Sequence, residues 1–350
     1  MSVPATAGAF ELRRLDGVDE LRSDWSGLAE AAGNPFATPE WTETWLRHAP
    51  EGTSASFWAC RRPDGSAAAV LPLVLVPGRY VRKLRFAGFG AANELGPVCA
   101  PADGDDAAAA LRRVLAVTRS GWDLFVGENL PGDGWAKRLG AQPVSSEPSP
   151  VVQLPPGGWD EYLASRSANF RQELRRKERR LAEQGIRFRT VEREAELEPA
   201  LDTLFRLHRL RWGSEASPFF AGLEAFHREF AAVALERGWL RLRLAERNDD
   251  AVAVNHCFRF GDAEWGYQIG RDPSDRAGSV GLILFAHSVR EAIAEGAAAF
   301  MLGPGAQPYK LRLATEDPGL ETVAVVRGLR GRAALLAERR RSRPQVEPAP

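Results

Sequence analysis

The second half of the chain alternates between two hydrophobic periods, one typical of helices and one typical of strands. Leu163, Phe170, Leu174 and Leu181 recur at helical spacing, which predicts a long helix over residues 159–184. Short apolar runs rich in branched residues then predict strands, followed by one more amphipathic helix and a strand. These elements cover residues 240–246, 251–260, 264–269, 282–293 and 298–302. The pattern therefore predicts an α/β unit in this half.

The first half repeats this order of elements. A hairpin turn is predicted in each half, at Arg62–Gly65 and at Arg247–Asp250, about 185 residues apart. The strands, Gly-rich loop, Ala-rich helix and last strand of the first half cover residues 56–61, 67–76, 80–86, 88–96, 105–119 and 122–126. Two helices precede them, one over residues 17–31 and one that begins at Pro39 with Thr38 as its N-cap. The repeated order indicates an internal duplication of a whole α/β unit.

The length of 350 residues also favours two domains, because a single hydrophobic core stops growing below that size. Residues 143–150 are rich in Pro and Ser, which predicts a linker. We therefore place an N-terminal domain at 1–150 and a C-terminal domain at 151–330, with its last strand over 321–326. Residues 331–350 are Arg-rich and then Pro-rich, which predicts a flexible tail.

Charge and composition limit the partners. The chain has 46 basic and 46 acidic residues, so no global field draws it onto nucleic acid or membrane, and we expect no DNA partner. The first residues lack the regions of a signal peptide, and no apolar run reaches the roughly 18 residues of a transmembrane helix. The three cysteines are odd in number and show no metal-ligand spacing. This pattern favours reduced thiols, a cytoplasmic location and no metal site.

The segment Gly278-Ser279-Val280-Gly281 stands where a predicted strand is followed by a helix. The first N–H groups of a helix are unpaired and its dipole is positive there, which suits a phosphate. Two glycines let the backbone approach the anion closely. We predict that these four residues, together with Arg276, bind the phosphate groups of a donor substrate. An ordinary strand–helix turn is the alternative for this segment.

Six motifs, taken in order, resemble one known family. They are Asn34-Pro35-Phe36, Ser167–Arg171, Arg211-Trp212, Phe219-Phe220, Gly303 and Tyr309-Lys310. This order resembles the GNAT-type acyltransferase family of CelD-like proteins, named for cellulose biosynthesis and distantly related to the Fem-type peptidyltransferases. The likeness spans roughly residues 30–326. It implies an α/β fold of tandem GNAT-like units, each a twisted mixed sheet flanked by helices.

The resemblance implies an N-acyltransferase, in which an amine attacks the thioester of coenzyme A or of a carrier protein directly. This chemistry needs a base for the ammonium, a donor for the oxyanion and an anchor for the diphosphate. His256 is our candidate base, because an imidazole titrates near neutral pH, and a structural histidine on a sheet face is the alternative. Tyr309 is a candidate donor to the leaving thiolate, or a packing residue. Lys310 is a candidate fixed charge, or a solvated lysine.

Five further residues are predicted to contact the acceptor, a small-molecule, sugar or peptide amine. They are Asn169, Arg171, Trp212, Asn255 and Tyr267. The basic helix around residues 166–180 predicts docking of an acyl carrier protein, coenzyme A phosphates or a tRNA end, although its interleaved glutamates equally fit a solvated, ion-paired helix. No permanently bound cofactor is expected. Two other functions remain open, tRNA-dependent aminoacyl transfer and a non-catalytic scaffold in exopolysaccharide biosynthesis.

The two halves differ in charge where their phosphate-side helix begins. In the first half, carboxylates near that helix start would repel a phosphate. They are Glu94, Asp103, Asp105 and Asp106. In the second half, Arg271 and Arg276 stand upstream of the helix, against Asp272 and Asp275. We therefore predict that the first domain shapes the acceptor side and the second domain binds the donor.

Overall fold

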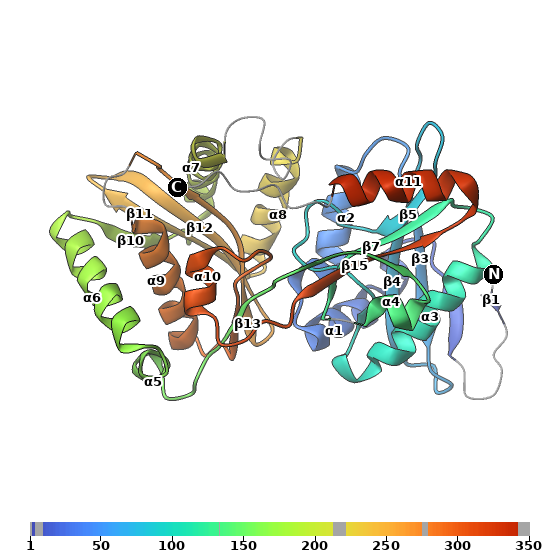
Figure 1. Ribbon diagram of the computed structural model, residues 1–350, viewed down its shortest axis with the longest axis horizontal. Coiled ribbons are helices and arrows are strands. Elements are labelled where there is room, and N and C mark those ends of the chain that lie inside the picture. The colour runs from blue at the N-terminus through green and yellow to red at the C-terminus, as the bar shows by residue number, and fades with distance from the viewer. Residues whose placement is uncertain (1, 4–9, 133, 213–221, 275–278, 342–350) are drawn as a thin grey trace. The chain divides into compact units, whose positions relative to one another are not determined.

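The chain folds into two α/β units, each a mixed β-sheet flanked by helices (Figure 1). The computed structural model describes residues 2, 3, 10–132, 134–212, 222–274 and 279–341, and of residues 2, 3, 211, 212 and 341 only the backbone. Unit 1 comprises Met1–Pro148 and Pro318–Pro350, and unit 2 comprises Ser149–Asp317. The predicted fold class is confirmed. Within the described residues, no helix combines the length and apolar character needed to cross a membrane.

Unit 1 is built on a nine-stranded sheet in the order β1-β2-β3-β4-β5-β7-β15-β8, with β6 paired to β4. Its strands are β1 (Ser2–Val3), β2 (Glu11–Arg14), β3 (Ser54–Arg61), β4 (Ala67–Val76), β5 (Lys83–Phe86), β6 (Val98–Cys99), β7 (Leu124–Pro131), β8 (Gln142–Glu147) and β15 (Leu320–Val326). β5 and β7 run parallel. β3 and β4 form the predicted hairpin, whose turn contains Gly65 at φ +86°.

Helices supply much of the core of unit 1. They are α1 (Arg22–Ala32), α2 (Pro39–Arg47), α3 (Gly104–Val117), α4 (Trp135–Leu139) and α11 (Gly328–Arg341), with the short 3-10 turns η1 (Asp19–Leu21), η2 (Pro35–Ala37) and η3 (Pro101–Asp103). α2 begins as predicted, because the Thr38 side chain accepts a hydrogen bond from the Trp41 N–H at 3.1 Å. Trp25 of α1 and Trp41 and Trp45 of α2 are buried, so these two helices provide the bulkiest apolar side chains.

Unit 2 has a six-stranded sheet in the order β10-β11-β12-β13-β14-β9. Its strands are β9 (Val151–Gln153), β10 (Arg187–Thr190), β11 (Leu240–Arg247), β12 (Asp250–Phe260), β13 (Ala263–Arg271) and β14 (Ala299–Met301). β13 and β14 run parallel, as β5 and β7 do in unit 1. The predicted turn between β11 and β12 is confirmed, with Asn248 and Asp249 at φ 50° and 66°. The order of elements predicted to repeat therefore does so in space.

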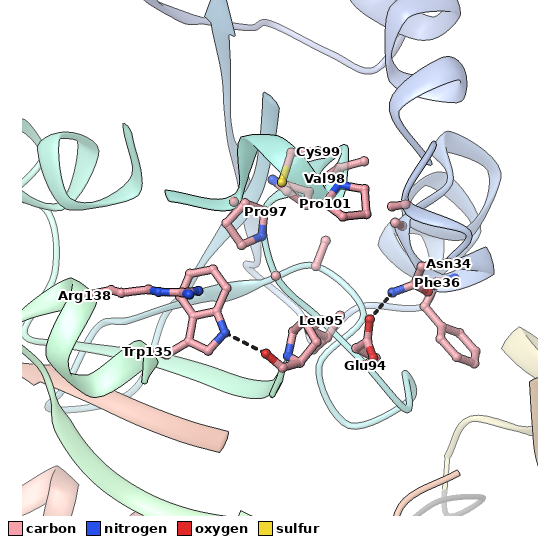
Figure 2. Close-up of a pocket in the computed structure, with 17 residues that line it drawn as sticks. Asn34, Phe36, Glu94, Leu95, Pro97, Val98, Cys99, Pro101, Trp135 and Arg138 are labelled. Carbon is pink, nitrogen blue, oxygen red and sulfur yellow. Dashed lines mark hydrogen bonds between the residues drawn. The ribbon is translucent and has the colours of Figure 1, made fainter. Parts of the chain in front are cut away.

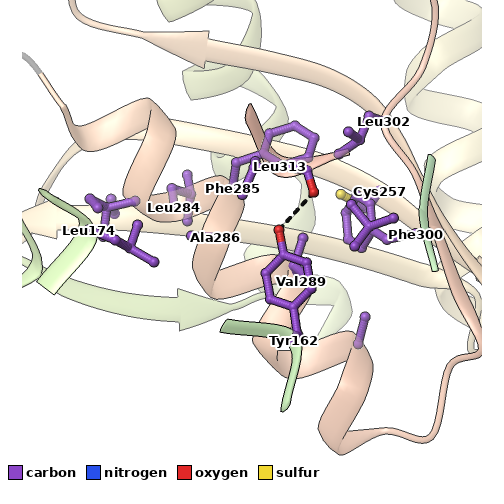
Figure 3. Packing of buried hydrophobic residues seen from close by; sticks show 14 of the residues in the cluster. Tyr162, Leu174, Cys257, Leu284, Phe285, Ala286, Val289, Phe300, Leu302 and Leu313 are labelled. Atoms are coloured by element: carbon purple, nitrogen blue, oxygen red, sulfur yellow. Dashed lines mark hydrogen bonds between the residues drawn. The ribbon is translucent and has the colours of Figure 1, made fainter. Parts of the chain in front are cut away.

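The helices of unit 2 cover both faces of its sheet. They are α5 (Trp159–Ala164), α6 (Ala168–Glu183), α7 (Glu194–Trp212), α8 (Glu224–Glu236), α9 (Val280–Ala294) and α10 (Pro308–Leu313). α5, α6 and α9 share one apolar core with Cys257 and Phe300 of the sheet. Figure 3 shows part of this core, where the Tyr162 hydroxyl donates to the Leu313 carbonyl at 2.8 Å. α7 packs on β12 and β13 from the other face.

The structure corrects two predicted elements around residue 150. Most of the predicted linker is β8, an edge strand paired with β15. Pro143 fits there because an edge strand has one side without ladder hydrogen bonds. The helix predicted over 159–184 is two helices, α5 and α6. The Ser167 side chain accepts from the Phe170 N–H at 3.2 Å and so starts α6 as a separate helix.

The structure also corrects the end of the second domain. The strand predicted over 321–326 is β15, which inserts between β7 and β8 of unit 1, so unit 2 ends at Asp317 rather than at residue 330. The segment predicted as a flexible tail is helical as far as Arg341. Strand pairing across this separation in sequence has no local signal, which is why the sequence did not predict it.

α11 is held on unit 1 by burial and by charge. Leu335 is buried in an apolar cluster with Leu124 of β7. The Glu338 carboxylate, also buried, forms ion pairs with Lys83 and, at 3.0 Å, with the Arg85 guanidinium. These contacts were not predictable from the composition of the segment, because its described arginines face outward and only a few of its side chains are buried against the sheet.

Candidate functional site

The parallel strands β13 and β14 of unit 2 diverge inside the sheet, and we call the place where they diverge the parting. β13 and β14 pair from Ala263 and Ala299 as far as Trp265 and Met301. β14 ends at Met301, whereas β13 continues to Arg271. The chain then enters α9 after β13 and α10 after β14. Any site at this parting is consequently built from two strands and the two helices that follow them.

The Phe285 side chain of α9 approaches Gly266, the first residue of β13 beyond the last strand pair. A Cβ atom there would lie 3.1 Å from Cζ of Phe285 and 3.2 Å from the Met301 carbonyl oxygen. The Phe285 ring centroid lies 5.5 Å from that of Tyr309. Gly266 permits this close approach, and we did not predict its role from the sequence. A lone glycine inside a predicted strand was the available signal.

Lys310 fixes the loop between β14 and α10. Its side chain is buried, and its ammonium donates to the carbonyls of Gly303 at 3.1 Å and Pro304 at 2.6 Å. Gly303 and Gly305 have φ values of +76° and +104°, which other residues rarely adopt. Tyr309 and Lys310 lie in the short helix α10, and the Lys310 charge is engaged by main-chain oxygens.

The N-terminus of α9 has no side-chain cap from any residue that the structure describes. Ser279 is the N-cap residue but makes no capping hydrogen bond, and no acidic residue lies in the first turn. Cδ of Arg271 lies 3.5 Å from the position that a Cβ on Gly281 would take, so the Arg271 side chain runs along this helix end. No carboxylate among the described residues forms an ion pair with Arg271. Val280 is buried in the core.

Two residues predicted to bind phosphate, Arg276 and Gly278, lie outside the described residues. The role given to them stays a prediction. Ser279, Val280 and Gly281 do lie at the helix N-terminus, where the sequence analysis placed them.

His256 lies on the other face of the sheet, in a cluster with Tyr267 and His227 of α8. The His256 and Tyr267 ring centroids are 5.3 Å apart, and the Tyr267 hydroxyl lies 3.3 Å from Nδ1 of His227. The pairing of β12 with β13 shifts register between His256 and Cys257, next to Gly266. A β-bulge re-aims side chains locally, and here it turns the Tyr267 ring toward α8.

Burial dominates the electrostatics of this cluster. His256 is 1% exposed, and neither of its ring nitrogens has a hydrogen-bond partner among the described residues. Desolvation, helped by His227, lowers the pKa of His256 to about 3. Burial also raises the pKa of the Tyr267 hydroxyl well above its usual value. Both side chains are therefore neutral at pH 7, and the imidazole is a weak base in these surroundings.

Asn255 points away from His256. Its amide nitrogen donates to the Ser288 hydroxyl of α9 at 2.9 Å, and no described residue donates to its carbonyl oxygen. Adjacent residues of a strand face opposite sides of the sheet, so these two predicted site residues cannot share one surface.

The remaining predicted contacts lie on helices. Asn169 is exposed at the start of α6 and lines a groove of about 370 Å³ with Phe170 and Arg312. The Arg171 guanidinium donates to the Ala164 carbonyl at 3.3 Å. Trp212 ends α7, and its side chain lies outside the described part of the chain. The described contacts of these residues do not reach Gly266 or His256.

The carboxylate nearest the parted strands along β13 is already paired. Glu264 is fully buried, and its carboxylate accepts two hydrogen bonds from the Arg243 guanidinium of β11, one of them at 3.0 Å. A base held in this way is not available to a substrate ammonium. The pair instead fixes the start of β13 against β11.

Comparison with known proteins gives a family match within unit 2. Residues 168–311, which include β13, α9 and β14, match the family model of the acetyltransferase (GNAT) domain. The curated proteins give no significant match. The matched segment lies within unit 2 and spans less than half of the chain, and the CelD-like name stays a prediction.

Three solved structures resemble the whole chain. FemX has a TM-score of 0.63 at 12% identity, with 93% of this chain and 100% of that one covered. L-PGS from Bacillus licheniformis gives 0.57 at 12% identity, with 91% and 95% covered. A tandem GNAT protein from the clavulanic acid biosynthesis pathway gives 0.52 at 15% identity, with 91% and 99% covered. At such identities the likeness shows the fold, which is that of tandem GNAT proteins.

Proposed function

We propose that unit 2 is an N-acyltransferase that moves an acyl group from a thioester donor to an amine. The observation that carries this proposal is the parting of β13 and β14 at Gly266, where Phe285 of α9 lies close to the β13 backbone and packs on Tyr309 of α10. A thioester placed between the strands would face backbone groups of β13 that no longer pair with β14. The match of residues 168–311 to the acetyltransferase (GNAT) domain supports the same reaction class.

The donor phosphates fit the N-terminus of α9. The N–H groups at its first turn lack a side-chain acceptor from Ser279, the helix dipole is positive there, and Arg271 adds a charge. We propose that Ser279, Val280 and Gly281, with Arg276 and Gly278 upstream, hold the diphosphate of coenzyme A or the phosphate of a carrier-protein arm. No permanently bound cofactor is needed.

In the reaction, the amine nitrogen forms a bond to the thioester carbon, the carbon–sulfur bond breaks, and the thiolate leaves. We propose that Tyr309 gives a proton to that thiolate, and the support is that its ring packs on Phe285, which reaches Gly266. Lys310 positions the loop that carries Gly303 rather than touching the donor. His256, our candidate for taking the ammonium proton, is buried on the other face of the sheet with its pKa lowered to about 3, so that role stays a prediction which this geometry does not support.

The test measures binding and turnover separately, with acetyl coenzyme A as probe. Gly266→Val should abolish donor binding, because the side chain needs space that Phe285 and the Met301 carbonyl occupy. Tyr309→Phe should lower kcat by about 10- to 100-fold with little change in donor affinity. Arg187→Ala, an exposed arginine of β10, is the control for general effects of substitution. Unchanged acetyl coenzyme A binding by Gly266→Val would overturn the placement of the donor.

The exposed arginines of α6 favour a second class of acyl donor, one that carries many negative charges. Arg175, Arg176, Arg179 and Arg180 are exposed on α6, and no carboxylate among the described residues forms an ion pair with any of them. Such a surface would suit an acidic acyl carrier protein or the phosphates of an aminoacyl-tRNA. Replacing the four arginines by glutamine should leave acetyl coenzyme A turnover unchanged and weaken only the polyanionic donor. Absence of transfer from all three donors would leave the non-catalytic scaffold as the explanation.

A further inference from the structure

Unit 1 contains a pocket of its own, of about 310 Å³. It lies where the parallel strands β5 and β7 end, between Ala87 and Pro131, and it reaches the first residue of α3, Gly104. Most of its wall is apolar. Figure 2 shows Asn34 and Glu94 on one side and Trp135 and Arg138 on the other. Nothing in the donor chemistry of unit 2 uses this pocket.

Glu94 is held in the pocket wall by a defined hydrogen-bond chain. The side-chain oxygen Oδ1 of Asn34 accepts a hydrogen bond from the Phe36 N–H at 2.8 Å, which fixes the orientation of the Asn34 side-chain amide. The Asn34 amide nitrogen then donates to one Glu94 oxygen at 3.1 Å. The next residue, Leu95, donates its N–H to the Asn129 carbonyl of β7 at 3.1 Å. The motif Asn34-Pro35-Phe36 therefore has a physical role, which is to hold a carboxylate in place.

The Glu94 carboxylate lacks a compensating cation. No arginine, lysine or histidine of the described residues forms an ion pair with it, and Asn34 is its one hydrogen-bond partner among them. Burial raises the pKa of Glu94 to about 7, despite the opposing effect of the Asn34 hydrogen bond. Arg138, which also lines the pocket, is engaged elsewhere. It pairs with Asp105 at 3.3 Å and lies over the Trp135 ring.

The pocket also limits the size and shape of an occupant. At the roughly 30 Å³ that a water molecule occupies in the liquid, its volume corresponds to about ten non-hydrogen atoms. The apolar side chains of Phe36, Leu95, Val98 and Trp135 favour a hydrocarbon body. The carboxylate at one end favours a positive group, which would supply the missing cation.

We propose that the unit 1 pocket binds a small organic primary amine, with its ammonium on Glu94 and its apolar body against Phe36, Leu95 and Trp135. This site is separate from the donor site of unit 2 and does not depend on acyl transfer there. Phosphate is excluded from the same position, because an anion would face an uncompensated carboxylate.

The test uses phenethylamine and its neutral analogue 2-phenylethanol on the full chain. Calorimetry should show phenethylamine binding and at least about ten-fold weaker binding of the alcohol. Glu94→Gln keeps an oxygen for the Asn34 amide but removes the charge, and should weaken phenethylamine binding about 10- to 100-fold while changing the alcohol little. Glu51→Gln, an exposed glutamate outside the pocket, is the matched control. Equal binding of amine and alcohol overturns the proposal.

Two further readouts do not depend on a variant. Binding of the ammonium should release close to one proton at pH 6 and almost none at pH 8.5, seen as buffer-dependent heat, because the Glu94 carboxyl is protonated only at the lower pH. Cys99 lines the pocket and is less buried than Cys60 and Cys257, so phenethylamine should slow its reaction with a thiol reagent. No proton release together with no protection of Cys99 rules the site out. Loss of acetyl coenzyme A binding in unit 2 does not bear on either result.

Discussion

Replacing His256 by leucine measures the cost of burying an imidazole without partners. The folded-state pKa of about 3 lies below the value of about 6.5 expected for an unfolded chain. Between these values the folded protein binds fewer protons than the unfolded one. The stability that depends on a neutral His256 is therefore complete above pH 6.5 and is lost as the pH falls toward 3.

The magnitude follows from the same two values. Between pH 7.5 and pH 4, the wild-type protein should lose about 3 kcal/mol of stability through this one residue, and His256→Leu should not. Leucine also removes two buried nitrogens that lack hydrogen bonds, so the variant should be more stable at pH 7.5 by about 1–3 kcal/mol. Phe258 and Tyr267, whose rings lie within 4.8 and 5.3 Å of the His256 ring, offer the apolar contacts that leucine needs.

Hydrogen exchange of the β12 and β13 amides, measured in urea at several pH values, is the suitable assay because a chain of two units need not unfold in one step. Parallel pH profiles for the two proteins would show that the ring is hydrated or paired in the folded state, and would refute the reasoning. Turnover decides the chemical role. A stable His256→Leu protein with at least about 100-fold lower kcat supports a base, and full activity means that His256 is structural.

Two further predictions concern unit 1. The pKa of Glu94 is raised from 4.5 to about 7, so its ionisation destabilises the fold as the pH rises through this window. Glu94→Gln should thus be more stable than wild type by up to about 3 kcal/mol at pH 8 and equally stable at pH 4, and equal stability at pH 8 contradicts the burial of the carboxyl. Leu335→Ala should cost about 2–4 kcal/mol in urea unfolding, whereas Leu336→Ala, at 59% exposure, should cost less than about 0.5. Equal costs would mean that α11 does not pack on the sheet.

Local chemistry determined the elements that the sequence predicted well. Thr38 followed by Pro39 specifies the start of α2 within a few residues, and Asn248 with Asp249 specifies a tight turn through backbone preferences. The same holds for the order of elements in each unit, since strand and helix periods are properties of neighbouring residues. A tandem α/β fold and a helix that begins near Gly281 followed from these signals alone.

Tertiary structure decided what depends on residues far apart in the chain. The insertion of β15 between β7 and β8 and the hydrogen bond from Asn34 to Glu94 join segments with no shared local pattern. The pKa of His256 and that of Glu94 depend on how much water the surrounding core excludes, which no single position encodes. Sequence periodicity fixes which side of an element is apolar, but which two surfaces meet is settled only when the whole chain packs.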